Sequence, residues 1–171
     1  HPLVHVNTSN LDQQSFTTTF TGKEFFVKDY QLKLNGTGAK KALPALASLE
    51  MARAAAEHIK PASKKAEAIS LQGISWGKPF LLNENRQLDI ILEKEGENGV
   101  YFEITSQQDN VEIIHAQGLA SYETAEQSFK FDVSKLQNEL QSNTREANEI
   151  YTAFSVMGLY LSLIHIRRCR R

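Results

Sequence analysis

One long apolar helix is the feature of this 171-residue chain that most restricts its fold. The stretch from Leu43 to Ile59 is rich in Ala, Leu, Glu, Met and Arg, which are strong helix formers. Pro44 suits a first turn, where a missing backbone N–H costs nothing, and Pro61 follows the end of the stretch. Apolar residues recur at helical spacing and nearly surround the rod. We therefore expect a helix that is buried rather than laid on a surface.

The segments around this helix alternate between apolar and polar residues, with the period of two that is typical of strands. After the helix they are residues 66–76, 87–94, 100–106 and 111–122, with a hairpin turn at residues 96–99. Before it, Phe16, Thr18 and Phe20 share one face of a strand over residues 14–21. Residues 25–30 are expected to be the strand that leads into the helix. Antiparallel strands wrapped around one helix predict an α+β hotdog fold.

Several short motifs in a fixed order carry a family resemblance. They are residues 26–30, Leu43-Pro44 with residues 49–52, residues 74–76 with Pro79, His115-Ala116-Gln117-Gly118, and the opening His1-Pro2-Leu3. Together they resemble the dehydratase domains of modular polyketide synthases, of the kind that lack built-in acyltransferases (trans-acyltransferase type). The resemblance covers about residues 1 to 159 and implies a double hotdog. Residues 1–124 would then be the N-terminal hotdog, and residues 125–160 a linker and the truncated start of the second.

The last eleven residues, 161–171, differ from the rest of the chain. They resemble the translation of an adaptor DNA used in sequencing libraries, and we interpret them as a non-native tail; a natural basic tail is the alternative. The tail holds four arginines and the only cysteine. Without it, 15 basic residues face 20 acidic ones, and the formal net charge falls from −1 to −5. A cysteine-free domain excludes disulfides and thiolate chemistry.

The composition indicates an ordinary globular protein, with 41% hydrophobic and 23% charged residues. No apolar run reaches membrane-spanning length and no signal peptide is evident, so we expect a cytoplasmic protein without a membrane partner. The basic residues outside the tail form no run, which argues against nucleic-acid binding. The histidines at positions 1, 5, 58 and 115 share no metal-ligand spacing, so no metal site is predicted.

The resemblance implies a specific dehydration chemistry. In the family, a histidine at the end of the strand before the central helix is the base, and an aspartate in the second hotdog is the acid. The family motif reads His, three residues, Gly, four residues, Pro. Here Tyr30 stands at the histidine position and Leu34 at the glycine position, while Pro44 lies at +14 in place of +9 and Ala45 replaces the usual glycine after it.

These departures predict a degenerate site. A phenol with a pKa of about 10 is ionised to about one part in a thousand at pH 7, so Tyr30 is a poor base. We therefore expect the fragment to be inactive alone, with Tyr30 at the catalytic position and Leu43, Pro44 and Ala45 binding substrate. The resemblance implies no directly bound cofactor, because the acyl chain arrives on the phosphopantetheine arm of an acyl carrier protein. It also implies neighbouring synthase domains, a second hotdog half and a homodimeric parent as partners.

The expected role is an acyl-chain holder or scaffold, and two alternatives stay open. The first is an altered-chemistry double hotdog, of isomerase or cyclase type, in which Tyr30 donates a hydrogen bond to the thioester carbonyl. The second is a stand-alone hotdog that hydrolyses acyl thioesters with Glu50 of the helix. Asp29 is interpreted as a solvated cap. His115 is interpreted as a hydrogen-bonded sheet residue on the same face as residues 113, 117 and 119. A half-domain expressed alone is expected to self-associate.

Overall fold

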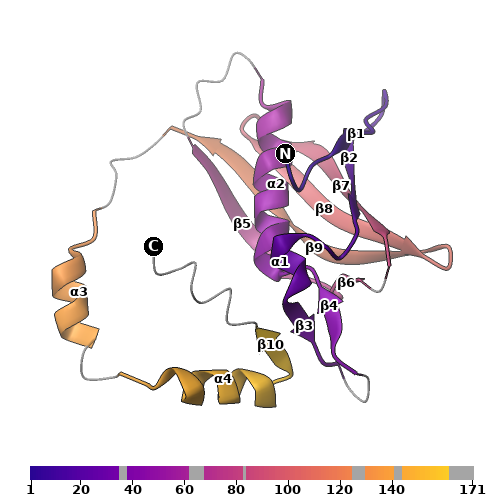
Figure 1. The fold of residues 1–171 in the computed structure, drawn as a ribbon. Coiled ribbons are helices and arrows are strands. Elements are labelled where there is room, and N and C mark those ends of the chain that lie inside the picture. Colours follow the sequence, from indigo (N-terminus) through magenta and orange to yellow (C-terminus); the bar gives the residue numbers. More distant parts are fainter. Residues whose placement is uncertain (35–37, 62–67, 83, 125–129, 141–143, 162–171) are drawn as a thin grey trace.

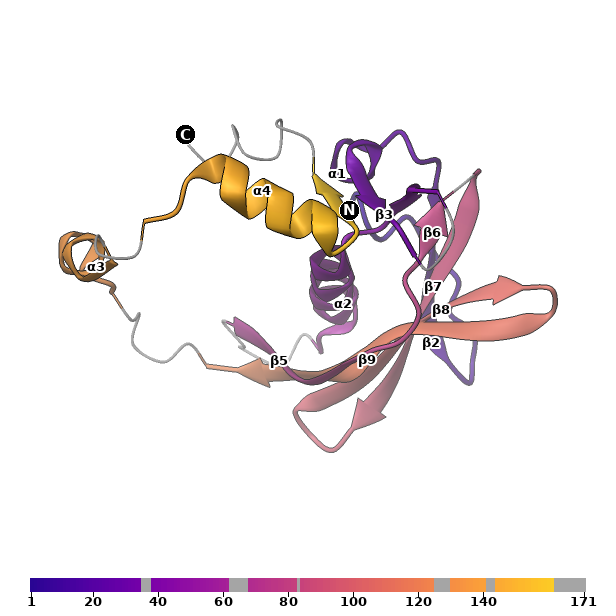
Figure 2. The ribbon, with the colours of Figure 1, turned by 90° about the horizontal axis from the view of Figure 1, so that it is seen from below.

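A curved antiparallel sheet holds one helix on its concave face (Figures 1 and 2). The computed structural model describes residues 1–34, 38–61, 68–82, 84–124, 130–140 and 144–161. The sheet has the strand order β1-β2-β7-β8-β9-β5. Its strands are β1 (Val6–Asn7), β2 (Gln14–Phe20), β5 (Ala68–Trp76), β7 (Arg86–Glu95), β8 (Gly99–Gln108) and β9 (Val111–Glu123). The helix is α2 (Ala45–Ile59). The predicted hotdog arrangement is thus present.

A second, smaller sheet lies at the N-terminal end of α2 (Figure 1). Its order is β10-β3-β4-β6, with β10 (Leu159–Leu161), β3 (Tyr30–Leu32), β4 (Lys40–Ala42) and β6 (Leu81–Leu82). The helices α3 (Val133–Leu140) and α4 (Ala147–Val156) follow the large sheet in sequence. In both views α3 stands apart from the large sheet. The interpretation of the tail concerns residues that, apart from Leu161 of β10, lie outside the described part of the chain.

Alternation places the core side chains of the sheet as predicted. Phe16, Thr18 and Phe20 are all buried, whereas Thr19 on the other face of β2 is exposed. On β7 the residues Leu88, Ile90 and Leu92 are buried in the same alternating way. The inner face of the sheet therefore supplies the large apolar side chains that pack on α2.

The central helix is buried along most of its length but not at its start. Met51, Ala52 and residues 54–56 are buried, and their small side chains let the sheet approach closely. Leu46 is 74% exposed, so the prediction of a helix that is buried all round is wrong for the first turn. That turn lies beside the small sheet instead of over the large one (Figure 1). Pro44 is the N-cap residue, one position before the helix begins.

The stretch predicted as a strand before α2 is instead a short helix, α1 (Phe25–Lys28), and β3 begins only at Tyr30. The Glu24 carboxylate accepts hydrogen bonds from the backbone N–H (2.7 Å) and the hydroxyl (2.9 Å) of Thr21, which turns the chain. The Glu24 carbonyl then accepts the N–H groups of Val27 and Lys28. Val27 is fully buried by this turn. Tertiary packing has overridden the strand propensity of Phe-Phe-Val.

The first residues are attached to the sheet through a buried threonine. The Thr18 hydroxyl donates to the Leu3 carbonyl (2.8 Å) and accepts the His5 N–H (3.3 Å). Thr18→Val keeps the shape but leaves both backbone groups without this partner, so we expect a loss of about 1–3 kcal/mol in the free energy of unfolding. Urea unfolding measures it. The matched change Thr19→Val on the exposed face should stay within about 0.5 kcal/mol; equal effects at the two positions would contradict this role of Thr18.

Candidate functional site

A cavity of about 130 Å³ opens where the small sheet meets the start of α2. Tyr30 from β3 and Leu43 and Ala45 from the start of α2 line it, so the structure brings these predicted site residues together. Pro44, the N-cap residue of α2, is not among the lining residues. The full lining consists of residues 30, 32, 43, 45, 48, 76–80 and 115.

The longer spacing between Tyr30 and Pro44 does not separate the two sides of this site. Strands β3 and β4 form an antiparallel pair in which Gln31 faces Lys41 and Leu32 faces Lys40. This register sets Tyr30, just before Gln31, and Leu43, shortly after Lys41, at the same end of the pair, and both line the cavity. Part of the connection between the two strands lies outside the described residues.

Tyr30 presents a neutral phenol to the cavity. Its side chain is half-buried, and burial raises the pKa of the hydroxyl above its ordinary value of 10. Within the described part of the chain the hydroxyl makes no hydrogen bond. At neutral pH it can donate a hydrogen bond to a bound group, but it cannot act as a base without first losing its own proton.

His115 also lines the cavity, and the sequence placed it on the wrong face of its strand. The pairing of β8 with β9 shifts between Ile104, which faces Ala116, and Thr105, which faces Ile114. His115 is the extra residue of this β-bulge. Both His115 and Ala116 are buried as a result, whereas the predicted alternation would have set His115 apart from Ala116. The adjacent Ile113 and Ile114 break the alternation just before the bulge, but such a break does not identify the extra residue.

A directed chain of hydrogen bonds holds His115. Its Nδ1 bonds the Lys78 carbonyl, which can only accept, so Nδ1 carries the proton. Its Nε2 then accepts the Ser106 hydroxyl at 2.8 Å, and Ser106 Oγ in turn accepts Arg86 Nη2 at 3.2 Å. The prediction of a hydrogen-bonded sheet residue is confirmed. Burial lowers the pKa of His115, and Arg86 lowers it further against the opposing effect of the Lys78 carbonyl.

The lowered pKa of His115 makes stability depend on pH. Below about pH 6.5 the unfolded chain binds a proton at this histidine more readily than the folded chain does. Stability should therefore fall as the pH falls through this range and be fully present above it. Urea unfolding at pH 7.5 and pH 5.5 measures the loss, which should be smaller in His115→Asn, a residue that does not titrate. An unchanged pH dependence in that variant would contradict the assignment.

The other candidates lie away from the cavity. Glu50 makes a bidentate ion pair with Arg53, with both bonds at 2.9 Å, and its carboxylate lies 3.2 Å from His1 Nε2. Glu50 is not among the residues that line the cavity. His58 is exposed and its ring lies 5.6 Å from that of Phe16. The described residues contain no cluster of three or more side chains suited to hold a metal ion. None of the described helices has the length and apolar character needed to cross a membrane.

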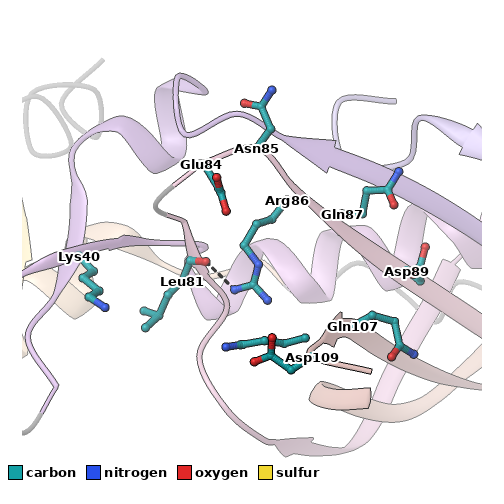
Figure 3. Close-up of a pocket in the computed structure, with 10 residues that line it drawn as sticks. Lys40, Leu81, Glu84, Asn85, Arg86, Gln87, Asp89, Gln107 and Asp109 are labelled. Atoms are coloured by element: carbon teal, nitrogen blue, oxygen red, sulfur yellow. Dashed lines mark hydrogen bonds between the residues drawn. The ribbon is translucent and has the colours of Figure 1, made fainter. Parts of the chain in front are cut away.

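A larger pocket, of about 690 Å³, is polar and lies beyond Arg86 (Figure 3). Its lining includes side-chain amides, two cationic side chains and three carboxylates. The lining residues are 40, 81, 84–87, 89 and 107–109. Figure 3 shows Arg86 reaching to the Leu81 carbonyl, a bond of 2.9 Å. None of the predicted site residues lines this pocket. The smaller cavity is therefore the candidate site.

A sheet wrapped around one buried helix, with a cavity at the start of that helix, defines the hotdog class. Within this class, the sequence model of the polyketide synthase dehydratase domain matches residues 1–107. The chain belongs to this family. The family prediction and the fold prediction are confirmed.

Relatives in the same family cover nearly the whole chain. Polyketide synthases PksN and PksM of Bacillus subtilis are 33% and 34% identical over 92% and 93% of it, which is 3% and 4% of their own lengths. A crystal structure of a trans-AT PKS dehydratase domain from Brevibacillus brevis is 33% identical with a TM-score of 0.83. The match covers 95% of this chain and 60% of that one. The dehydratase domain from the CurF module of curacin polyketide synthase shares the fold, at 20% identity and a TM-score of 0.80 over 95% of this chain and 58% of its own.

Proposed function

We propose that this chain is the acyl-binding first half of a polyketide synthase dehydratase-type domain that does not itself dehydrate. The observation that carries the proposal is Tyr30, a neutral phenol in the cavity at the position where the family resemblance places the catalytic histidine. In the CurK dehydratase, which is 20% identical, a histidine-to-phenylalanine or an aspartate-to-asparagine replacement gives an inactive protein. In that protein, therefore, a single substitution is sufficient to stop the reaction.

The chemistry needs a group that this cavity lacks. Elimination of water from a β-hydroxyacyl thioester requires a base to remove the α-proton and an acid to protonate the departing hydroxyl. Tyr30 keeps its proton, and a lysine such as Lys78 is a cationic side chain, so neither offers a base at neutral pH. Both ring nitrogens of His115 are already engaged, one as donor to Lys78 and the other as acceptor from Ser106. No described residue that lines the cavity is a free base.

The same cavity is suited to hold an acyl chain. Leu32, Leu43 and Phe80 provide apolar walls, and Ser48 and Tyr30 add hydroxyls. A volume of about 130 Å³ approaches that of an apolar cavity of about 150 Å³ that binds benzene, so it fits a short acyl segment. The chain would be delivered on the phosphopantetheine arm of an acyl carrier protein, with no cofactor bound directly. We place the chain in a cytoplasmic, homodimeric synthase, beside neighbouring domains and a second hotdog half. In this proposal residues 1–124 form the first hotdog, and residues 125–160 form the linker and the start of the second.

The test is binding without turnover. The parent domain is mixed with a β-hydroxyacyl pantetheine, and NMR follows both its binding and the vinyl protons that elimination would produce. We expect binding with no enoyl product. Ala45→Trp at the exposed start of α2 should block the cavity and abolish binding, which separates specific from general adsorption. Elimination by the unaltered domain would refute the proposal.

One observation favours a second candidate, an altered chemistry of isomerase or cyclase type. The Tyr30 hydroxyl stays protonated and has no partner among the described residues, so it is placed to donate a hydrogen bond to a thioester carbonyl. Tyr30→Phe would then remove turnover of an enoyl or cyclisable substrate while leaving the cavity intact. The hydrolase alternative has no such support, because Glu50 lies outside the cavity lining.

A further inference from the structure

One wall of the cavity is a segment without a strand of its own. Residues 77–80 connect the end of β5 to the start of β6, and all four line the cavity. Two backbone bonds attach the segment to the β9 bulge: the Gly77 N–H donates to the His115 carbonyl (3.0 Å) and the Lys78 N–H to the Ile114 carbonyl (3.1 Å). A Cβ added at Gly77 would lie 2.2 Å from the Ile114 oxygen, so this close approach requires glycine.

A further backbone bond, from the Leu43 N–H to the Phe80 carbonyl (2.9 Å), joins the segment to the start of α2, and the His115 side chain adds to these attachments. Its Nδ1–H donates to the Lys78 carbonyl, and its ring meets the Phe80 ring edge-on with centroids 5.1 Å apart. The imidazole thus contacts the wall on both sides of Pro79. At 7% exposure, it is almost shielded from solvent.

Ser106 and Arg86 continue the hydrogen bonds on the other side of the His115 ring. Because the Lys78 carbonyl can only accept, the ring proton lies on Nδ1, and Nε2 accepts the Ser106 hydroxyl, whose oxygen accepts from Arg86. Arg86 also bonds the Leu81 carbonyl just beyond the wall and lies over the Phe80 ring at 4.8 Å. In this series of hydrogen bonds, from Arg86 through Ser106 and His115 to Lys78, every donor therefore points toward the wall.

We infer that His115 is a positioning residue of the acyl cavity, which holds residues 77–80 as a preformed wall through its Nδ1–H bond to Lys78. The inference rests on the proposed function, because the wall matters for binding only if an acyl chain occupies the cavity. Its role is not that of an acid or base. A preformed wall spares the ligand the cost of ordering the segment when it binds.

The test compares two amides of similar size in the parent domain. His115→Asn places an N–H near Nδ1 and keeps the Lys78 bond, whereas His115→Gln reaches the position of Nε2, keeps the Ser106 bond and loses Lys78. The first readout is amide hydrogen exchange at Gly77 and Lys78. We expect exchange about tenfold faster in His115→Gln and near wild type in His115→Asn. A second measurement needs no variant and applies if His115→Gln does not fold: the ring ¹⁵N signals of the unaltered domain should show the proton on Nδ1, which bonds the Lys78 carbonyl.

The second readout is affinity for a short acyl pantetheine. It should fall about tenfold in His115→Gln and less than about threefold in His115→Asn. Equal exchange in the two variants, or a ring proton on Nε2 in the unaltered domain, would overturn the inference. Failure of the unaltered domain to bind the acyl pantetheine would instead refute the proposed function, because the exchange readout needs no ligand.

Discussion

Tyr30→His in the parent domain is expected to raise the rate of dehydration of a β-hydroxyacyl thioester by about 10²-fold or more over the unaltered domain. A positioned general base contributes typically about 10²–10⁴-fold, and an imidazole titrates near neutral pH, whereas burial raises the pKa of the Tyr30 phenol. The substitution acts at a residue that already lines the cavity with Leu43 and Ala45. It supplies a base at this position, and under the proposed function the acid is expected from the second hotdog half.

The measurement is the appearance of the enoyl thioester under saturating substrate. Tyr30→Phe is the matched control, because it keeps the ring and adds no base, and its rate should stay at the background. A Tyr30→His domain as slow as Tyr30→Phe would contradict the prediction. In that case the lesion would lie in the other departures, the leucine at position 34 or the alanine at position 45, or in the acid of the second half.

Local periodicity was sufficient to predict most of the large sheet. The alternation of Phe16, Thr18 and Phe20, and the hairpin between β7 and β8, depend on neighbours in sequence, and both are present. The helix over residues 45–59 was equally clear from its composition. Its exposed first turn was not, because Leu46 leaves the core only where the large sheet ends, which is a property of the whole fold.

Features that depend on contacts between distant segments were not predicted from the sequence. The small sheet joins strands from residues 30–32, 40–42, 81–82 and 159–161, and each of these is too short to carry a periodic signal. The α1 turn depends on the contact of Thr21 with Glu24 and on burial of Val27. The prediction of a strand over residues 25–30 considered propensity alone and not these contacts.

The site was predictable only in part, for a related reason. Tyr30, Leu43 and Ala45 were found because short motifs carry them, and the structure places all three at the cavity. His115 and residues 77–80 were missed as lining residues. Their position depends on a bulge, which shifts the side chains that follow by one face and cannot be located from alternation alone.

Phe20→Ala is expected to cost about 3–5 kcal/mol in the free energy of unfolding, the usual range for a buried phenylalanine. Phe20 is fully buried. Its ring meets Phe26 of α1 edge-on at 6.3 Å and Phe80 of the cavity wall at 6.0 Å. It therefore joins three parts of the molecule, namely β2, the α1 turn and the wall, and none of its neighbours can fill the space without leaving its own contacts.

Urea unfolding of the parent domain measures this loss, with Phe131→Ala as the control for a phenylalanine that is 69% exposed; the control should stay within about 0.5 kcal/mol. Because a domain is stable by only about 5–15 kcal/mol, the core substitution should remove a large part of its stability. A loss below about 1 kcal/mol would mean that the Phe20 site collapses freely. The packing of Phe20 on Phe80 would then contribute little to the wall, which would depend on its backbone bonds and on the His115 side chain.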